Sequence, residues 1–216
     1  GNSIKFLSFS ERGVGLSRNT ALMRATADIC LFADEDVTFV DNYKDLIINA
    51  FKERPECDMM IFNVPSKNNN RPTYNITKVS KVRWYNCLRY GAVRIAVKTE
   101  ILKKKNIYFS LLFGGGAKYS AGEDSLFIAD CIKKKMKVYT NPIVIGYVSQ
   151  EDSTWFKGFT DKFFIDKGIF FAALSQRLAR IFCLRYAIKH RRLFKNGKSW
   201  VEAYKLMIKG VNEYCN

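Results

Sequence analysis

An apolar run at residues 29–33, Ile-Cys-Leu-Phe-Ala, ends abruptly in the acidic triplet Asp-Glu-Asp at 34–36, and no other feature constrains the fold as strongly. A run that is apolar at every position is typical of a strand buried on both faces. Helical spacing of apolar residues over 43–53 and a strand-like run over 58–64 follow. This alternation predicts an α/β fold with a mainly parallel central sheet flanked by helices. The acids then lie at the carboxyl end of a strand, where such sheets bind ligands.

The remaining elements follow from the same periodicities. In chain order we expect a strand over 4–9, a helix over 17–27 capped by Ser17, a strand over 92–97, a helix over 122–135, and strands at 138–139 and 143–145. From Thr154 onward the chain is predicted to be helical. Over 170–194 the basic residues overlap the apolar sector of a helical wheel, so one clean amphipathic helix is not expected there. We therefore divide the chain into an α/β domain over 1–150 and a basic helical extension over 151–216 that packs on it.

Composition sets outer limits on function. The 216 residues suffice for one sizeable core, and the six scattered cysteines, without a CxxC pair, favour reduced thiols over a zinc site or a disulfide framework. The net charge of +16 attracts polyanions such as nucleic acid, anionic lipid or phosphorylated ligands. No apolar stretch reaches the roughly 18–20 residues of a membrane span, and the N-terminus lacks a signal-peptide layout. We expect a cytoplasmic chain.

Two acidic clusters are the candidates for chemistry. Asp34 and Asp36, one residue apart, offer the hard oxygen ligands through which a divalent cation bridges the phosphates of a diphosphate leaving group. Glu123 and Asp124 open the predicted helix, where a carboxylate accepts the proton of an attacking hydroxyl. Each cluster also has a structural explanation. An acidic turn is readily solvated, and acids in a first helical turn favour the helix dipole by roughly 0.3–1 kcal/mol.

Three segments, in this order and spacing, resemble the family-2 glycosyltransferases of GT-A fold: Gly15–Asn19, Leu31–Asp36 and Gly122–Phe127. A fourth, Ser153–Phe156 with Gly158 and Lys162–Phe164, resembles a segment of one bacterial branch of that family. The resemblance implies a Rossmann-like fold and a transferase of cell-surface polysaccharide biosynthesis. Such an enzyme moves a sugar from a nucleotide-diphosphate donor, a UDP-sugar first of all, to a hydroxyl of a glycan or lipid-linked acceptor, with inversion.

On the donor side, the resemblance implies that Arg18 and Asn19 help to place the nucleoside diphosphate. Asp34 and Asp36 become the DxD pair that binds the donor and holds Mn²⁺ or Mg²⁺, with Asp36 as the direct metal ligand. For Arg18 and Asn19 the alternative is ordinary polarity at a helix start.

On the acceptor side, the resemblance makes Asp124 the catalytic base and Glu123 its neighbour that orients or binds the acceptor. Trp155 would stack on an acceptor sugar ring. A tryptophan buried in the core is the alternative for that position.

The chain departs from the family pattern in two places. Many relatives have a metal-binding histidine shortly before the segment at 153–156, where this chain has Tyr-Val-Ser-Gln at 147–150, and His190 lies far downstream. Metal coordination would then rest on carboxylates, phosphates and water. The segment at residue 4 also corresponds to a point after the family's first strand and helix. If those elements are missing, an unpaired sheet edge results, which a homodimer would cover.

Two other hypotheses remain open. The charge and the lysine runs at 103–105 and 133–135 suit a basic module that binds nucleic acid or an anionic membrane, although such runs are usually solvated surface. The other hypothesis is a non-catalytic relative of the transferases. An enzyme acting on lipid-linked sugars would combine both features, with a basic tail in peripheral contact with the inner face of the membrane.

Overall fold

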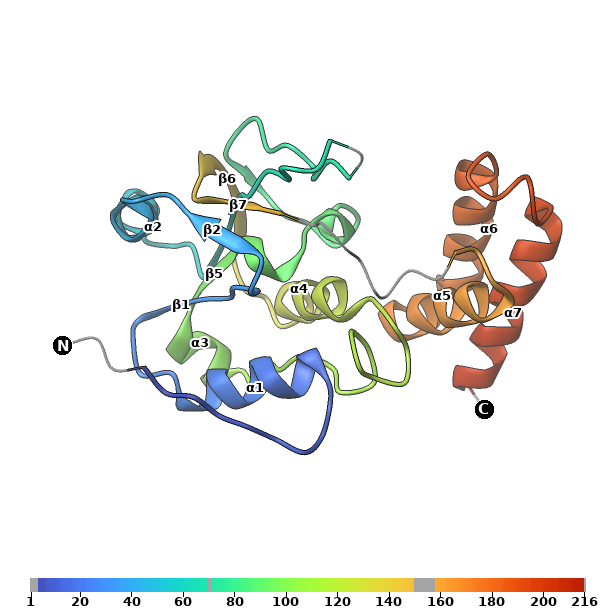
Figure 1. Cartoon of the computed structure of the whole chain (residues 1–216), viewed down its shortest axis with the longest axis horizontal. Coiled ribbons are helices and arrows are strands. Elements are labelled where there is room, and N and C mark those ends of the chain that lie inside the picture. Colours follow the sequence, from blue (N-terminus) through green and yellow to red (C-terminus); the bar gives the residue numbers. More distant parts are fainter. Residues whose placement is uncertain (1–3, 70, 150–157, 216) are drawn as a thin grey trace.

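The computed structural model describes residues 4–69, 71–149 and 158–215. Figure 1 shows a central sheet with helices around it and, at the opposite end of the molecule from α2, a group of three helices formed by the C-terminal part of the chain. The predicted α/β class, with a central sheet flanked by helices and a helical C-terminal region, is confirmed.

The central sheet has five strands in the order β1-β5-β3-β6-β4. Its strands are β1 (Ile29–Leu31), β3 (Met59–Asn63), β4 (Ser80–Lys81), β5 (Ile95–Lys98) and β6 (Val138–Val144). Among the described strands of this sheet, β3 and β6 alone pair in parallel and the other neighbours are antiparallel, so the prediction of a mainly parallel sheet is wrong. The described part of the connection from β3 to β5 carries β4 and two short 3-10 helices, η1 (Cys87–Arg89) and η2 (Ala92–Arg94). A parallel neighbour needs a longer crossover, usually an α-helix.

A second, two-stranded ribbon was not expected. It consists of β2 (Val37–Phe39) and β7 (Gly146–Val148), which pair antiparallel with Val37 opposite Val148. Strand β2 begins directly after the acidic triplet at 34–36. The ribbon therefore ties the acidic turn to the end of β7.

Four helices belong to the sheet region: α1 (Val14–Arg24), α2 (Tyr43–Glu53), α3 (Thr99–Lys104) and α4 (Glu123–Lys133). Helix α2 has the predicted bounds, and α4 begins one residue later than expected. Helix α1 begins at Val14, so the prediction that Ser17 caps it is wrong. The Ser17 N–H instead donates to the Gly13 carbonyl at 3.1 Å, within the first turn. Gly13, with φ of 148°, starts the helix in a conformation that suits glycine.

The predicted strand at residues 4–9 is not formed. These residues pair with no strand in the described part of the chain, and Ile4 and Phe6 are 95% and 90% exposed. An isolated extended segment leaves its backbone groups to water, so the apolar pattern alone does not make a strand.

The central sheet is covered on both faces. Along β3, alternate side chains enter two apolar clusters: Met59 and Ile61 join one, Met60 and Phe62 the other. All five residues of the strand are buried. This is the side-chain alternation of a strand between two layers. The first cluster continues through α1 and α4 into the C-terminal helices, so the apolar core runs from the sheet to the three-helix end.

The three-helix end comprises α5 (Asp161–Leu174), α6 (Ala179–His190) and α7 (Trp200–Cys215). Glycines allow α5 and α7 to approach closely. A Cβ atom on Gly168 would collide with the Met207 backbone, and one on Gly210 would collide with the Ile165 backbone. Because α5 ends at Leu174 and α6 starts at Ala179, the expectation that 170–194 is not one amphipathic helix is confirmed. In the described residues, no helix is long and apolar enough to cross a bilayer.

Candidate functional site

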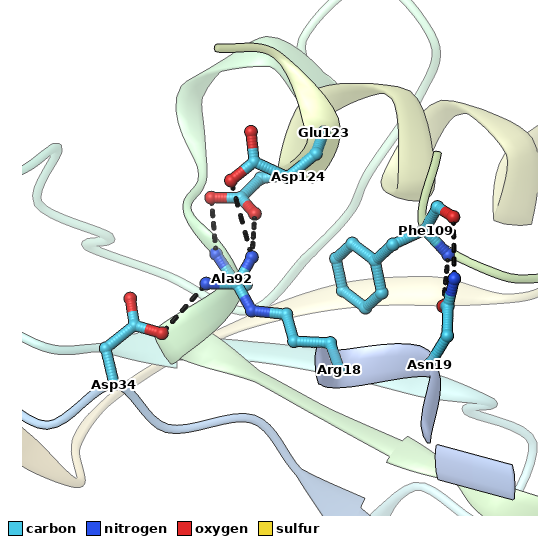
Figure 2. A network of polar contacts seen from close by, with 7 residues as sticks. All are labelled: Arg18, Asn19, Asp34, Ala92, Phe109, Glu123 and Asp124. Carbon is cyan, nitrogen blue, oxygen red and sulfur yellow. Dashed lines mark hydrogen bonds and ion pairs between the residues drawn. The ribbon is translucent and has the colours of Figure 1, made fainter. Parts of the chain in front are cut away.

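The guanidinium of Arg18 joins the two acidic clusters (Figure 2). Its Nη2 lies 2.8 Å from Asp34 Oδ1, and its Nη1 lies 2.7 Å from Asp124 Oδ1 and 3.4 Å from Glu123 Oε1. The arginine side chain is only 10% exposed, so solvent screens these interactions less than those of a surface pair. Residues from α1, from the turn after β1 and from the start of α4 thus converge on one charged centre.

Close backbone contacts hold α1, and therefore Arg18, in place. Gly15 packs so tightly that a Cβ atom there would collide with the Ser110 carbonyl. The Val14 N–H donates to the Gly115 carbonyl at 2.9 Å. The Arg18 guanidinium also lies over the Phe109 ring, 5.2 Å from its centroid. The glycine loop and the Phe109 segment therefore set where the arginine points.

Asn19 was predicted to contact the donor, but the structure places its amide on the backbone of Phe109 (Figure 2). Its Nδ2 donates to the Phe109 carbonyl at 2.9 Å, and its Oδ1 accepts from the Phe109 N–H at 2.8 Å. The residue is buried. Asn19 therefore positions α1 against the 109 segment, one residue away from the arginine.

The acidic triplet lies in the tight turn between β1 and β2. The Val37 N–H donates to the Asp34 carbonyl at 3.2 Å, and the Ser149 N–H donates to the Asp36 carbonyl at 3.1 Å. Asp34 is exposed and Asp36 is half-buried. Residues 147–149 therefore run directly beside Asp36, with Ser149 as the contact.

Helix α4 presents its first two side chains to Arg18. It starts after Gly122, whose φ of 115° is a glycine conformation. Asp124 accepts a second hydrogen bond, from the Ala92 N–H to Oδ2 at 3.0 Å. Glu123 packs under the glycine loop, where a Cβ atom on Gly114 would approach Glu123 Cδ to 2.8 Å. Both carboxylates are thus fixed by contacts on several sides.

Burial raises the pKa values of both acids at the start of α4. Burial, and next the charge of Asp124, raise the pKa of Glu123 to about 7, against the opposing pull of Arg18. Burial also raises the pKa of Asp124, and Arg18 and the Ala92 N–H oppose that rise. Burial would lower the pKa of Arg18, but Asp124 and Asp34 outweigh it and raise that pKa. A carboxyl group that titrates near neutrality suits acid-base chemistry.

The polar groups at this centre are not all satisfied. The Arg18 Nε atom is buried and has no hydrogen-bond partner in the described structure. A buried unpaired donor is costly. The arginine therefore retains one N–H beyond those that its carboxylates use.

The predicted metal ligands Asp34 and Asp36 belong to the same turn, and carboxylate oxygens are the ligands that Mn²⁺ and Mg²⁺ prefer. Among the described residues, no group of three or more His, Cys, Asp or Glu side chains could hold a metal ion. His190 lies on α6, where its ring contacts Tyr186 at a centroid distance of 4.6 Å. A cation at this turn would therefore complete its coordination with phosphate oxygens and water. Trp155, the predicted acceptor residue, lies outside the described residues.

Two contributors to the site were not predicted from the sequence: the Ala92 backbone, which binds Asp124, and Phe109, which supports both Arg18 and Asn19. Backbone hydrogen bonds leave no mark in a sequence, so the Ala92 contact had no signal. The three consecutive glycines at 114–116, shortly before a helix, are a sequence signal of close backbone packing.

The chain is similar in structure to TarS of S. aureus. Residues 1–349 of TarS in complex with UDP-GlcNAc match with a TM-score of 0.67 and 17% identity over 95% of this chain. The same fragment in complex with UDP matches with a TM-score of 0.63 and 16% identity over 94% of this chain. This chain spans 64% and 63% of the length of those two structures. No protein-family profile and no curated relative matches the sequence.

At this level of identity the likeness concerns architecture. This chain combines a mixed central sheet, an acidic turn after β1 and a helix that opens with Glu123. Its fold aligns over nearly its whole length with those structures. The chain has a GT-A fold, which it shares with those TarS structures.

Proposed function

We propose that the protein transfers a sugar from a nucleoside-diphosphate donor, a UDP-sugar first of all, to a hydroxyl group of a glycan or lipid-linked acceptor, with inversion at the anomeric carbon. The observation that carries the proposal is the convergence of Asp34 with Glu123 and Asp124 on Arg18. The similar TarS structures are named as complexes with UDP-GlcNAc and with UDP, which supports a uridine donor.

The centre has the groups that a diphosphate leaving group requires. Arg18 supplies a fixed cation with several N–H donors in fork geometry, which suits phosphate oxygens. Asp36 and Asp34 would hold Mn²⁺ or Mg²⁺ at the adjacent turn, and the bound cation would neutralise charge on the departing diphosphate. Binding of the donor would therefore redistribute the contacts that Arg18 now makes with carboxylates.

The proposed reaction is a direct displacement. The acceptor hydroxyl oxygen forms a bond to the anomeric carbon while the bond from that carbon to the diphosphate oxygen breaks. The hydroxyl proton passes to Asp124, and the electron pair of the broken bond leaves with the nucleoside diphosphate. Because attack occurs opposite the leaving group, the anomeric configuration inverts.

The two acids of α4 receive different roles from their surroundings. Arg18 and the Ala92 N–H hold Asp124 in one orientation and oppose the rise of its pKa that burial causes. Glu123, with a pKa raised to about 7, carries a proton in a large fraction of molecules at neutral pH. We assign Asp124 as the base and Glu123 as the residue that donates a hydrogen bond to the acceptor.

The central experiment measures sugar transfer and donor hydrolysis with a panel of UDP-sugars, for the wild type and for Asp124→Asn. Loss of a general base lowers the rate by about 10²-fold or more, and we expect a loss of that size. Asp130→Asn is the matched control, because Asp130 lies on the same helix and pairs only with exposed Lys133 in the described structure. Equal rates for Asp124→Asn and the wild type would exclude Asp124 as the base.

The metal proposal needs a separate test. We expect UDP to raise the Tm of the wild type more with Mn²⁺ than without it, and Asp36→Asn to abolish that difference. Asp41→Asn is the control, since Asp41 is exposed and lies beyond β2. If Mn²⁺ still increased the effect of UDP on the Tm of Asp36→Asn, Asp36 would not be a metal ligand.

A further inference from the structure

Helix α6 turns small side chains and the rings of Phe182 and Tyr186 toward the core, and it exposes its large aliphatic side chains. Ala179, Cys183 and Ala187 are fully buried against the neighbouring helices. On the outer face, Ile181, Leu184 and Ile188 are 61%, 40% and 43% exposed. A helix on a protein surface usually turns its large aliphatic residues inward. In α6 the outer face carries them instead.

The three exposed aliphatic residues form one continuous stripe. Their spacing of three and four residues places them on the same side of a helix. At about 100° per residue, Arg180 lies on one flank of the stripe, and Arg185 and Lys189 lie on the other. All three basic residues are exposed. The outer face of α6 is therefore an apolar stripe bordered by cations.

Along the sequence, the residues around this stripe are basic, and near its end Lys198 pairs with Asp161. Between Asp166 and Glu202 the chain contains nine lysines and arginines and not one acid. At the C-terminal end of α6 a hollow of about 290 Å³ is lined by Arg191, Arg192, Lys195, Lys198, Ser199 and Trp200. Trp200 is 42% exposed there, and Leu193 beside the hollow is 63% exposed. The stripe thus ends at a basic hollow that contains an indole ring.

We propose that the outer face of α6, with the basic hollow at its end, is a docking surface for an anionic lipid bilayer. An apolar stripe enters the boundary between headgroups and acyl chains, while flanking arginines and lysines attract the anionic headgroups. Tryptophan is enriched at that depth because its ring is amphipathic. Figure 1 shows α6 in the three-helix end, away from the sheet, so the bilayer would contact this end of the molecule.

Charge complementarity selects this partner. A protein surface would have to supply both an apolar strip and acids on its two sides, whereas an anionic bilayer supplies both features everywhere. Each basic residue near such a surface strengthens binding, and binding declines as salt screens the charges. This inference does not rest on the proposed sugar transfer.

The test is co-sedimentation of the whole chain with vesicles. One set contains phosphatidylglycerol and phosphatidylcholine in equal parts, and the other contains phosphatidylcholine alone. We expect binding to the first set, much weaker binding to the second, and at least about tenfold weaker binding to the first set for the triple variant I181Q/L184Q/I188Q. The matched control is I48Q/V79Q/L111Q, which replaces aliphatic residues of closely similar exposure elsewhere and should bind like the wild type.

A second triple variant tests the charges without changing the stripe. R180Q/R185Q/K189Q should bind the anionic vesicles several-fold more weakly, and the control K52Q/K67Q/K78Q, with the same loss of charge at other exposed positions, should bind more tightly than it. Circular dichroism checks that each variant is folded, and if I181Q/L184Q/I188Q does not fold, the charge variant decides the matter.

Three results would overturn the proposal. The wild type could fail to bind anionic vesicles, or the α6 variants could bind as tightly as their controls. Light scattering could also show that the wild type forms a dimer that I181Q/L184Q/I188Q does not form, which would assign the stripe to a second copy of this chain.

Discussion

The sheet region and the three-helix end use their side chains in opposite ways. In the sheet region, α4 buries Leu126, Phe127 and Ile128 and turns its acids toward Arg18. At the three-helix end, α6 buries alanine and cysteine and exposes isoleucine and leucine. Both helices have similar lengths, yet α4 buries large aliphatic residues whereas α6 exposes its own and turns Phe182 and Tyr186 toward the core. The placement of the large aliphatic residues distinguishes the two helices.

The same contrast holds for charge. The excess of basic residues in the chain is not uniform: three acids surround one arginine at the candidate site, while the segment from α5 to α7 has an uninterrupted basic stretch. The net charge of +16 therefore reflects the basic helical end more than the candidate site, where acids outnumber the arginine.

The sharpest test of this contrast replaces one large apolar residue in each region. Phe127→Ala should lower the free energy of unfolding by about 3–5 kcal/mol, because its ring stacks on Phe109 at 4.0 Å and is almost fully buried. Ile181→Ala should change it by about 0.5 kcal/mol or less, since the side chain faces outward. Urea unfolding followed by circular dichroism measures both values. Equal losses would show that the outer face of α6 is packed.

Glycines test how closely the three-helix end is assembled. Gly168→Ala should cost about 1–3 kcal/mol, because the added Cβ collides with the Met207 backbone, which has to shift. Gly197→Ala is the control: nothing lies within 4 Å of a Cβ atom there, so we expect a change within about 0.5 kcal/mol. Thermal unfolding compares the two variants with the wild type. An unchanged Tm for Gly168→Ala would mean that α5 and α7 tolerate a wider spacing.

Titration of Glu123 tests the charged centre. Its folded-state pKa is raised to about 7, so the folded state holds the proton more tightly than the unfolded chain, and this contribution to stability is lost as the pH rises from about 4.5 to above 7. Glu123→Gln removes the ionisation. We expect the variant to be about 1–2 kcal/mol more stable than the wild type at pH 8.

At pH 4, where Glu123 is protonated in both states, the two proteins should differ much less. Urea unfolding at the two pH values gives the comparison. A difference that does not change with pH would mean that Glu123 ionises in the folded state as readily as in the unfolded chain.

The smallest effect concerns helix starts, where the two regions also differ. Helix α5 is capped by Thr160, whose Oγ1 accepts from the Phe163 N–H at 3.2 Å, whereas α4 starts after Gly122 without a side-chain cap. Thr160→Ala should cost about 1 kcal/mol. Thr77→Ala, at an exposed loop position, is the reference in the same unfolding assay. Equal free energies of unfolding for the two variants would show that the Thr160 cap does not stabilise α5.

The sequence predicted what depends on local periodicity. Helix 43–53 has its expected bounds because its apolar residues recur at helical spacing, and the buried strand at 59–63 follows from its uninterrupted apolar run. The order of the motifs and their resemblance to the family-2 glycosyltransferases predicted that the acids at 34–36 and at 123–124 belong to one site. The structure brings Asp34 and Asp124 to the same arginine.

What the sequence did not predict depends on contacts between distant segments. The direction of β5 is set by the long connection before it, and residues 4–9 form no strand because pairing requires a neighbour. Asn19 reads as a polar residue at a helix start, yet its amide bonds to the backbone of Phe109, 90 positions away. No local pattern records such a bond. The exposed stripe on α6 was hidden for a related reason, since sequence alone does not say which of two apolar faces is buried.

At Gly122 the sheet region and the three-helix end are in close contact. Its missing side chain leaves the space into which the Phe170 ring of α5 fits, and a Cβ atom there would approach Phe170 Cδ2 to 2.5 Å. The next two residues are the acids of the candidate site. The Phe170 ring therefore packs directly against the start of α4, and α5 cannot move closer to α4 at this point. Phe170 thus limits where Gly122, and with it the start of α4, can lie.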